Sequence, residues 1–144
     1  MPIYMKYGKI NGPVTGKYKG WIELTSCQFG VGRGISTPVG TSSKRESSTP
    51  NISEIVVTKA MDITSPLLFQ EALTGEGTKV IIEFAQSDKL QTVYLQVELE
   101  NAMVSGYSVS SGGDRPSESV SINSTKIMYK VTVATAPPAT VTGP

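Results

Sequence analysis

The chain has 144 residues, a length that fits one domain with a substantial buried core. Its 13 basic and 12 acidic residues give a net charge of +1, which argues against a nucleic-acid binder, because such proteins carry a strongly basic surface. With no histidine and a single cysteine, Cys27, the sequence excludes Ser-His-Asp and Cys-His catalysis, an internal disulfide and a cysteine-based zinc site.

No stretch of the sequence approaches the length of a transmembrane helix, so we expect no membrane anchor. The N-terminus lacks a basic segment followed by an apolar run, so we expect no cleavable secretory signal. These features predict a protein made in the cytoplasm that would need a dedicated machine for export.

Alternating apolar and polar side chains predict strands in the first part of the chain. Residues 1–10, 21–29 and 52–61 show this alternation, and an Asn-Gly-Pro turn at residues 11–13 separates the first two. Apolar residues on one face of each strand are expected to point into a core.

The segment at residues 30–51 is rich in glycine, proline, serine and threonine, and its few apolar residues are Val31, Ile35 and Val39. A loop of about 20 residues is unusual inside a compact domain, and it normally has a function or is disordered. Its polar tip at residues 42–48 cannot join a core. We therefore expect an extended loop.

One helix is predicted, within residues 62–77. Thr64 or Ser65 is the expected N-cap, Pro66 fits the first helical position, and Gly75 fits a left-handed C-cap. Such a short helix is not stable alone in water, so we expect its apolar face to be buried on a sheet or barrel. That face comprises Leu68, Phe69, Ala72 and Leu73.

The second half of the chain returns to strand patterns. The predicted strands span residues 79–86, 91–101, 102–110, 117–123 and 125–134, with a bend at residues 102–106. The proline- and threonine-rich residues 135–144 are expected to be disordered or loosely held. Seven or eight strands and one helix predict a mainly β fold, a small antiparallel barrel with a flanking helix.

Candidate chemistry is weak throughout. The glycines at residues 30–34 lack the Gly-Lys-Ser/Thr ending and the following helix of a phosphate loop. Cys27 has no histidine to activate it and is expected to be a structural thiol. Glu98 and Glu100 lie two apart on one strand face, which favours a solvated face or an interface over a catalytic pair. We expect no enzyme, no cofactor and no metal site.

The order of elements nevertheless resembles the hemolysin-coregulated protein (Hcp) family of type VI secretion systems. The most specific segments are IVVTKAMD at residues 55–62, followed by TSPLL at residues 64–68, and DRPSESVS at residues 114–121. The resemblance covers about residues 1–134, which it identifies as a tube domain with the extended loop 30–51.

The resemblance implies a barrel flanked by one helix, with no catalytic site. Hexameric rings of identical subunits would stack into a hollow tube that a contracting sheath drives, with a spike protein at its tip, into a target cell. The lumen would carry effector proteins, and the protein would be secreted by the type VI route. The nearest alternative is a phage-tail-like tube protein of another contractile injection system.

A ring of one kind of chain needs an interface between two different surfaces. The long loop and the outward strand face are the expected contacts, and the candidate residues are Thr41, Lys44, Arg45, Glu46, Glu98 and Glu100. A small β-barrel ligand carrier, which would need an interior cavity, and a secreted enzyme, which would need a catalytic group, remain as alternatives. Size-exclusion chromatography with light scattering distinguishes a ring from a monomeric carrier.

Overall fold

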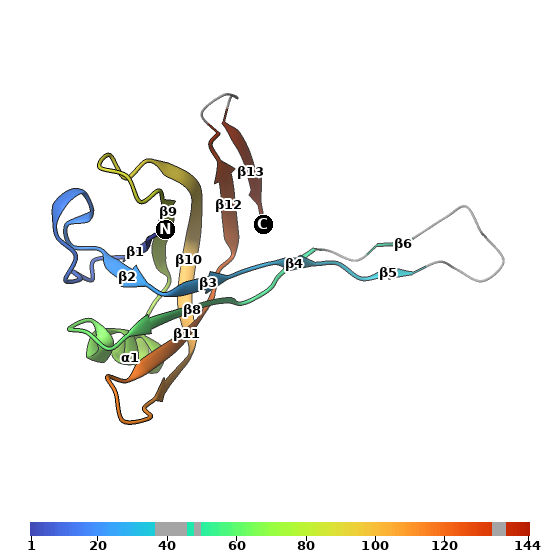
Figure 1. Cartoon of the computed structure of the whole chain (residues 1–144). Helices are drawn as coiled ribbons and strands as arrows, with labels where there is room; N and C mark the ends of the chain where they lie inside the picture. Colours follow the sequence, from blue (N-terminus) through green and yellow to red (C-terminus); the bar gives the residue numbers. More distant parts are fainter. Residues whose placement is uncertain (37–45, 48–49, 134–137) are drawn as a thin grey trace.

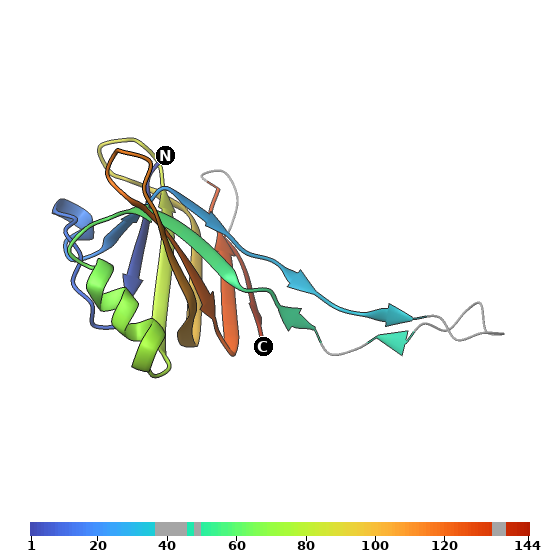
Figure 2. The ribbon, with the colours of Figure 1, turned by 90° about the horizontal axis from the view of Figure 1, so that it is seen from below.

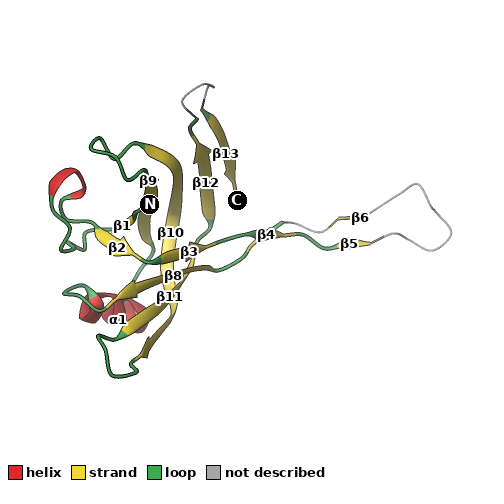
Figure 3. Cartoon of the chain, in the orientation of Figure 1, coloured by secondary structure: helices red, strands yellow, loops and turns green. Residues whose placement is uncertain are grey.

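The computed structural model describes residues 1–36, 46–47, 50–133 and 138–144 (Figure 1). Nine strands form one antiparallel sheet, and the helix α1 (Ser65–Thr74) packs against it (Figure 3). The predicted mainly β fold with one short α-helix is confirmed. The nine strands are β1 (Ile3–Tyr7), β2 (Ile22–Leu24), β3 (Ser26–Gln28), β8 (Ile55–Ala60), β9 (Thr78–Ala85), β10 (Val93–Ser110), β11 (Ser117–Asn123), β12 (Lys126–Val131) and β13 (Ala139–Gly143).

The strands follow the order β2-β1-β9-β10-β11-β8-β3. The two ends of this path are neighbours in the chain, because only Thr25 separates β2 from β3, and its N–H donates to the carbonyl of Thr58 at 2.8 Å. The sheet therefore curls back toward its own start, and the hairpin of β12 and β13 extends from β10 (Figure 1).

Strand β10 is unusually long and has neighbours on both edges. Its first part pairs with β12 on one edge and with β9 on the other, and its second part pairs with β11. The register shifts between Val104 and Gly106, and Asn101 has a positive φ of 52°. The predicted bend at residues 102–106 is therefore confirmed, as a bulge at the point where β10 passes from one partner to the next.

The core lies on the inner face of the curled sheet. Period-two alternation sends every second side chain of the central strands inward, as predicted. Fully buried members of the core are Met5, Tyr7, Ile22, Ile55, Val57, Leu68, Val80, Ile82, Val97, Leu99, Val120 and Ile122.

The ends of helix α1 differ from the prediction in detail. Thr64 occupies the N-cap position and Pro66 lies in the first turn, but the side chain of Thr64 makes no cap hydrogen bond. The Asp62 carboxylate accepts the Thr64 N–H instead, at 2.8 Å. Gly75 has a φ of −66°, so it is not a left-handed C-cap. A Cβ there would lie 2.5 Å from the Glu71 carbonyl oxygen, so glycine permits a close approach rather than a left-handed turn.

The apolar helix face is only partly buried. Leu68 is fully buried and Ala72 packs against the core, but Phe69 is 52 % exposed and Leu73 is 64 % exposed. The Phe69 ring lies edge-on to Tyr107, with centroids 5.8 Å apart, at the margin of the helix–sheet contact. The expected burial of Phe69 is therefore wrong, because the helix presents a narrow stripe to the core.

The number of strands and the tail also differ from the prediction. The described residues contain thirteen strands rather than seven or eight, because four short strands lie between β3 and β8 and β13 follows β12. Residues 139–143, expected to be disordered or loosely held, pair with β12 from Ile127↔Gly143 to Val131↔Ala139. Backbone pairing thus holds a segment whose side chains are mostly exposed.

We expect the protein to lose stability as the pH rises from about 10 to about 12. Burial, and to a lesser degree the charge of Glu71, raises the pKa of Tyr7 from 10.0 to about 12. The unfolded chain therefore releases this proton at a lower pH than the folded chain, so the free energy of unfolding falls across this window. Urea denaturation at several pH values measures the slope. Tyr7→Phe should make this slope shallower; equal slopes for Tyr7→Phe and wild type would contradict the assignment.

Candidate functional site

A two-stranded arm projects from the body between β3 and β8 (Figures 1 and 2). In it β4 (Val31–Gly32) pairs with β7 (Asn51–Ile52), and β5 (Ile35–Ser36) pairs with β6 (Glu46–Ser47). The described part of the segment predicted as a loop thus contains paired strands. Val31 is 70 % exposed and Ile35 is 56 % exposed, so the arm presents apolar side chains to solvent.

An apolar groove lies where the arm leaves the body, between the base of the arm and the β12–β13 hairpin. Its volume is about 490 Å³. The rings of Phe29 and Tyr129 lie 5.4 Å apart and link its two sides. We call it the arm-root groove; its walls include Phe29, Val31, Ile52, Ile127, Tyr129 and Val141.

The interface candidates from the tip of the loop are only partly covered by the structure. Thr41, Lys44 and Arg45 lie outside the described residues. Glu46 begins β6, where its backbone pairs with that of Ser36. The proposal that this tip contacts a neighbouring subunit therefore stays a prediction.

The two glutamates of β10 lie between basic residues. Glu98 makes an ion pair with Lys79 of β9, and its hydrogen bond, followed by its charge, raises the pKa of the lysine. Glu100 is exposed and faces Lys126 of β12 across the strand pair. Each carboxylate thus has a cation as a cross-strand neighbour, which fits a charged outer face rather than a catalytic pair.

A buried ionic cluster joins the start of the helix to the sheet. The Lys59 ammonium is fully buried and donates to Glu118 Oε1 at 2.7 Å and to Asp62 Oδ1 at 3.0 Å. Ser65 Oγ donates to Glu118 Oε1 at 2.8 Å, and the Tyr107 hydroxyl donates to Glu118 Oε2. Burial, followed by the contact with Glu118, raises the pKa of Tyr107 to about 12. The cluster fixes α1 to three strands, β8, β10 and β11.

No role was predicted for Lys59, Ser65 and Glu118, although they lie in the segments 55–62, 64–68 and 114–121 that carry the family resemblance. The sequence did indicate that both residues are buried. Lys59 lies two residues after Val57, on the same inward face of β8, and Glu118 lies two residues before Val120, on the same inward face of β11. The register sets Lys59 directly opposite Glu118. Opposite charges at inward positions of two strands indicate a buried pair, but only the pairing of the strands identifies the partners.

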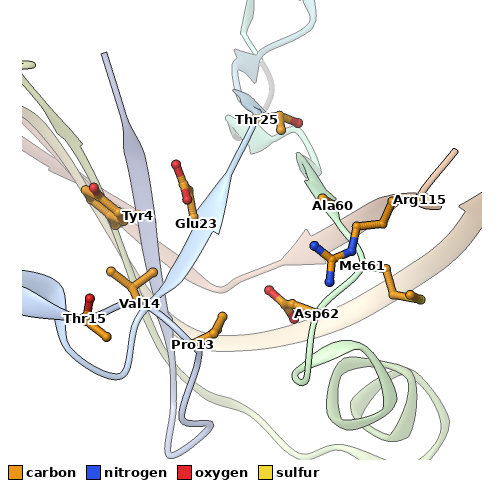
Figure 4. A pocket seen from close by; sticks show the side chains of 10 residues that line it. All are labelled: Tyr4, Pro13, Val14, Thr15, Glu23, Thr25, Ala60, Met61, Asp62 and Arg115. Atoms are coloured by element: carbon orange, nitrogen blue, oxygen red, sulfur yellow. The ribbon is translucent and has the colours of Figure 1, made fainter.

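A polar pocket of about 630 Å³ lies near the end of β8 (Figure 4). Glu23 lines it from β2 and Thr25 from the position between β2 and β3, and Figure 4 shows the Arg115 guanidinium turned toward Asp62. Asp62 already accepts bonds from Lys59 and the Thr64 N–H, so it is held in a structural role. The pocket brings together no nucleophile and activating base among its lining residues.

Cys27, the remaining candidate nucleophile, lies half-buried on β3. Burial raises the pKa of its thiol to about 11, so the thiol is protonated at neutral pH, as a structural cysteine is. Among the described residues, no cluster of three or more acidic or cysteine side chains is suited to hold a metal ion. None of the helices formed by these residues has the length and apolar character needed to cross a membrane.

One family model matches most of this chain. A family model described as "Type VI secretion system effector, Hcp" matches residues 4–131. None of the curated proteins matches this sequence significantly.

Several solved structures share the fold. A type six secretion system protein has a TM-score of 0.80 and 24% identity, over 90% of this chain and 83% of that one. Hcp1 from Salmonella typhimurium has a TM-score of 0.80 and 19% identity, over 98% and 92% of the two chains. A type VI secretion system effector from Yersinia pestis has a TM-score of 0.80 and 14% identity, with 98% of both chains covered.

Proposed function

Because the chain belongs to the Hcp family of type VI secretion proteins, we propose that it is a tube subunit, whose copies close into hexameric rings that stack into a hollow tube. The family is structural, and this chain is not an enzyme. It is a secreted protein of the type VI system. We assign residues 1–134 to the tube domain, and we propose that sheath and spike proteins engage the tube and that effectors travel in its lumen.

The observation that carries this proposal is the arm. Its described strands pair only within the arm, and Val31 and Ile35 remain exposed. A projecting ribbon with exposed apolar residues suits contact with another copy of the chain. A contact between the arm of one copy and a different surface of the next is compatible with a closed ring or a stack.

The charged outer face offers a second contact. Glu98 and Glu100 are proposed interface residues, together with Thr41, Lys44, Arg45 and Glu46 of the loop. Exposed ion pairs contribute only about 0–1 kcal/mol each, so these residues would direct the orientation of subunits more than hold them together.

A ligand carrier is less well supported. The inner face of the sheet is filled by its own side chains, among them Met5, Ile82 and Leu99, which are fully buried. The arm-root groove lies outside that core, so it provides no enclosed interior cavity.

We expect shortening of the loop to weaken assembly but not folding. Replacement of residues 41–48 by a short Gly-Ser link removes the polar tip together with β6 and leaves the nine strands of the main sheet intact. The far-UV spectrum and the melting temperature of the body should stay close to wild type. Sedimentation velocity over a concentration series, with electron microscopy for stacked tubes, should show weaker ring formation, weaker stacking or both.

Two outcomes would contradict this expectation. Assembly at the same concentrations, with equal stacking, would make the tip a passive loop. Failure of the shortened chain to fold would place the tip in the core. A monomeric wild-type protein at every concentration would contradict the tube proposal itself.

A further inference from the structure

We propose that a pocket at the end of helix α1 binds a small organic diamine, with one ammonium held by Glu71 and the Tyr7 hydroxyl and the other by Glu76. The pocket has a volume of about 810 Å³ and lies between the end of α1, the turn after β1 and the segment that leads into β9. We call it the helix-end pocket; its lining includes Tyr7, Lys9, Asn11, Glu71, Thr74 and Glu76. The assignment is independent of the tube proposal, because it uses groups of a single chain.

The Tyr7 hydroxyl is the first reason to expect a ligand. Tyr7 is fully buried, and its hydroxyl has no hydrogen-bond partner among the described residues. The backbone N–H of Val104 lies close by, without the geometry of a hydrogen bond. Buried polar groups almost always have a partner, so each exception needs an explanation. Because Tyr7 lines the pocket, a group bound there is placed to supply the missing bond.

The Glu71 carboxylate is the second reason. It is half-buried and makes no ion pair within the part of the chain that the structure describes. A Cβ on Gly75 would collide with Glu71 Oε2, so the carboxylate folds back over the end of the helix. Burial, followed by the charge of Glu71, raises the pKa of Tyr7 to about 12. The hydroxyl is therefore neutral at pH 7, and one ligand can contact both groups, accepting nothing and donating to each oxygen.

The charge of the pocket selects a cation. Two carboxylates, those of Glu71 and Glu76, line it with one ammonium, that of Lys9. The end of α1 adds partial negative charge from carbonyls without helical partners, and no basic residue in its last turn offsets that charge. A primary ammonium carries three N–H donors, which suits a carboxylate, a phenol oxygen and a carbonyl together.

The second carboxylate extends the site toward solvent. Glu76 is exposed, whereas the Tyr7 hydroxyl is covered, so the two ends of the site lie at different depths. A linear diamine places one ammonium at each end. The inner ammonium reaches the hydroxyl only after a lining side chain moves, and the long Glu71 side chain, which no ion pair holds, is the group that can turn.

Calorimetric titration of the full chain with diaminobutane, which has a primary amine at each end, tests the site. Wild type should bind one equivalent per chain, and Glu71→Gln and Tyr7→Phe should each weaken binding at least five-fold. Glu23→Gln is the matched control, because it removes a carboxylate from the other polar pocket, and it should bind like wild type. Tyr7→Phe should keep the melting temperature of wild type, because the hydroxyl it removes has no partner.

Two other ligands separate recognition from simple charge attraction. The bis-quaternary analogue, in which methyl groups replace every N–H, keeps both charges but cannot donate, and it should bind at least ten-fold more weakly than diaminobutane. Lysine with both backbone ends capped presents one ammonium as a peptide would. It should bind at least five-fold more weakly, because it leaves one of the two carboxylates, Glu71 or Glu76, without a cation.

Several results would overturn the assignment. Wild type that shows no saturable binding at millimolar diaminobutane would remove the site. Equal affinity for wild type, Glu71→Gln and Tyr7→Phe would place the ligand elsewhere, and if Tyr7→Phe fails to fold, Glu71→Gln against Glu23→Gln still decides. Equal binding of the bis-quaternary analogue would leave only charge attraction. Tighter binding of the capped lysine would replace the free diamine by a peptide. None of these results bears on ring assembly, so the tube proposal stands or fails separately.

Discussion

Lys59→Met is expected to lower the free energy of unfolding by about 3–5 kcal/mol, because it leaves the buried carboxylate of Glu118 without its cation. The geometry supports a large effect, since Lys59 is fully buried, Glu118 is 2 % exposed, and their charged atoms lie 2.7 Å apart. Urea denaturation at neutral pH measures the change. The far-UV spectrum shows whether the variant still folds.

Two comparisons identify the cause of this loss. Lys79→Met removes the cation from the exposed pair with Glu98 and should change stability little, because water solvates the remaining charge. The double variant Lys59→Met with Glu118→Leu should recover at least half of the loss, because no unpaired charge stays buried. Asp62, which is 17 % exposed at its side chain, can turn to water in that variant. A double variant less stable than Lys59→Met would show that the cluster stabilises through its other hydrogen bonds.

Leu68→Ala is expected to cost about 2–5 kcal/mol, because it opens a cavity beneath the helix. Leu68 is fully buried between α1 and the sheet, and it belongs to the same core cluster as the inward residues of the strands. Thermal and urea denaturation should both show the loss.

The exposed helix residues provide the matched control. Leu73→Ala removes the same atoms from a side chain that is 64 % exposed, so the change should stay within about 0.5 kcal/mol. Phe69→Ala should lie between the two, because it removes an edge contact with Tyr107 but no core volume. Equal losses for Leu68→Ala and Leu73→Ala would show that burial does not distinguish the two leucines.

Much of the fold could be predicted because local alternation is strong. Val97 and Leu99 fall on the inward face of β10, and Glu98 between them lies on the outer face, as the two-residue period requires. The bend in the same strand could also be predicted, from the interruption of alternation near Gly106.

Other features depend on distant parts of the chain. Phe69 looks like a core residue by its helical spacing, yet the width of the contact with the sheet leaves it exposed. The tail alternates over only five residues, from Ala139 to Gly143, directly after two prolines, and it pairs as a strand because β12 offers an edge. For the candidate site, the amino-acid composition predicted that residues 30–51 form an extended loop. Its short strands depend on the pairing of Val31 with Ile52 across the arm, which composition does not specify.

The order of the strands in the sheet affects how the chain can fold while the ribosome is still making it. Before residue 78 emerges, β1 can pair only with β2, and β8 only with β3, because β9 and β11 follow later in the sequence. Two separate strand pairs cannot bury their apolar faces, and closing contacts over such long sequence separations is slow. The nascent chain therefore exposes the inward residues of its first half until β9, β10 and β11 have left the ribosome, and folding of this protein completes only when most of its length has been made.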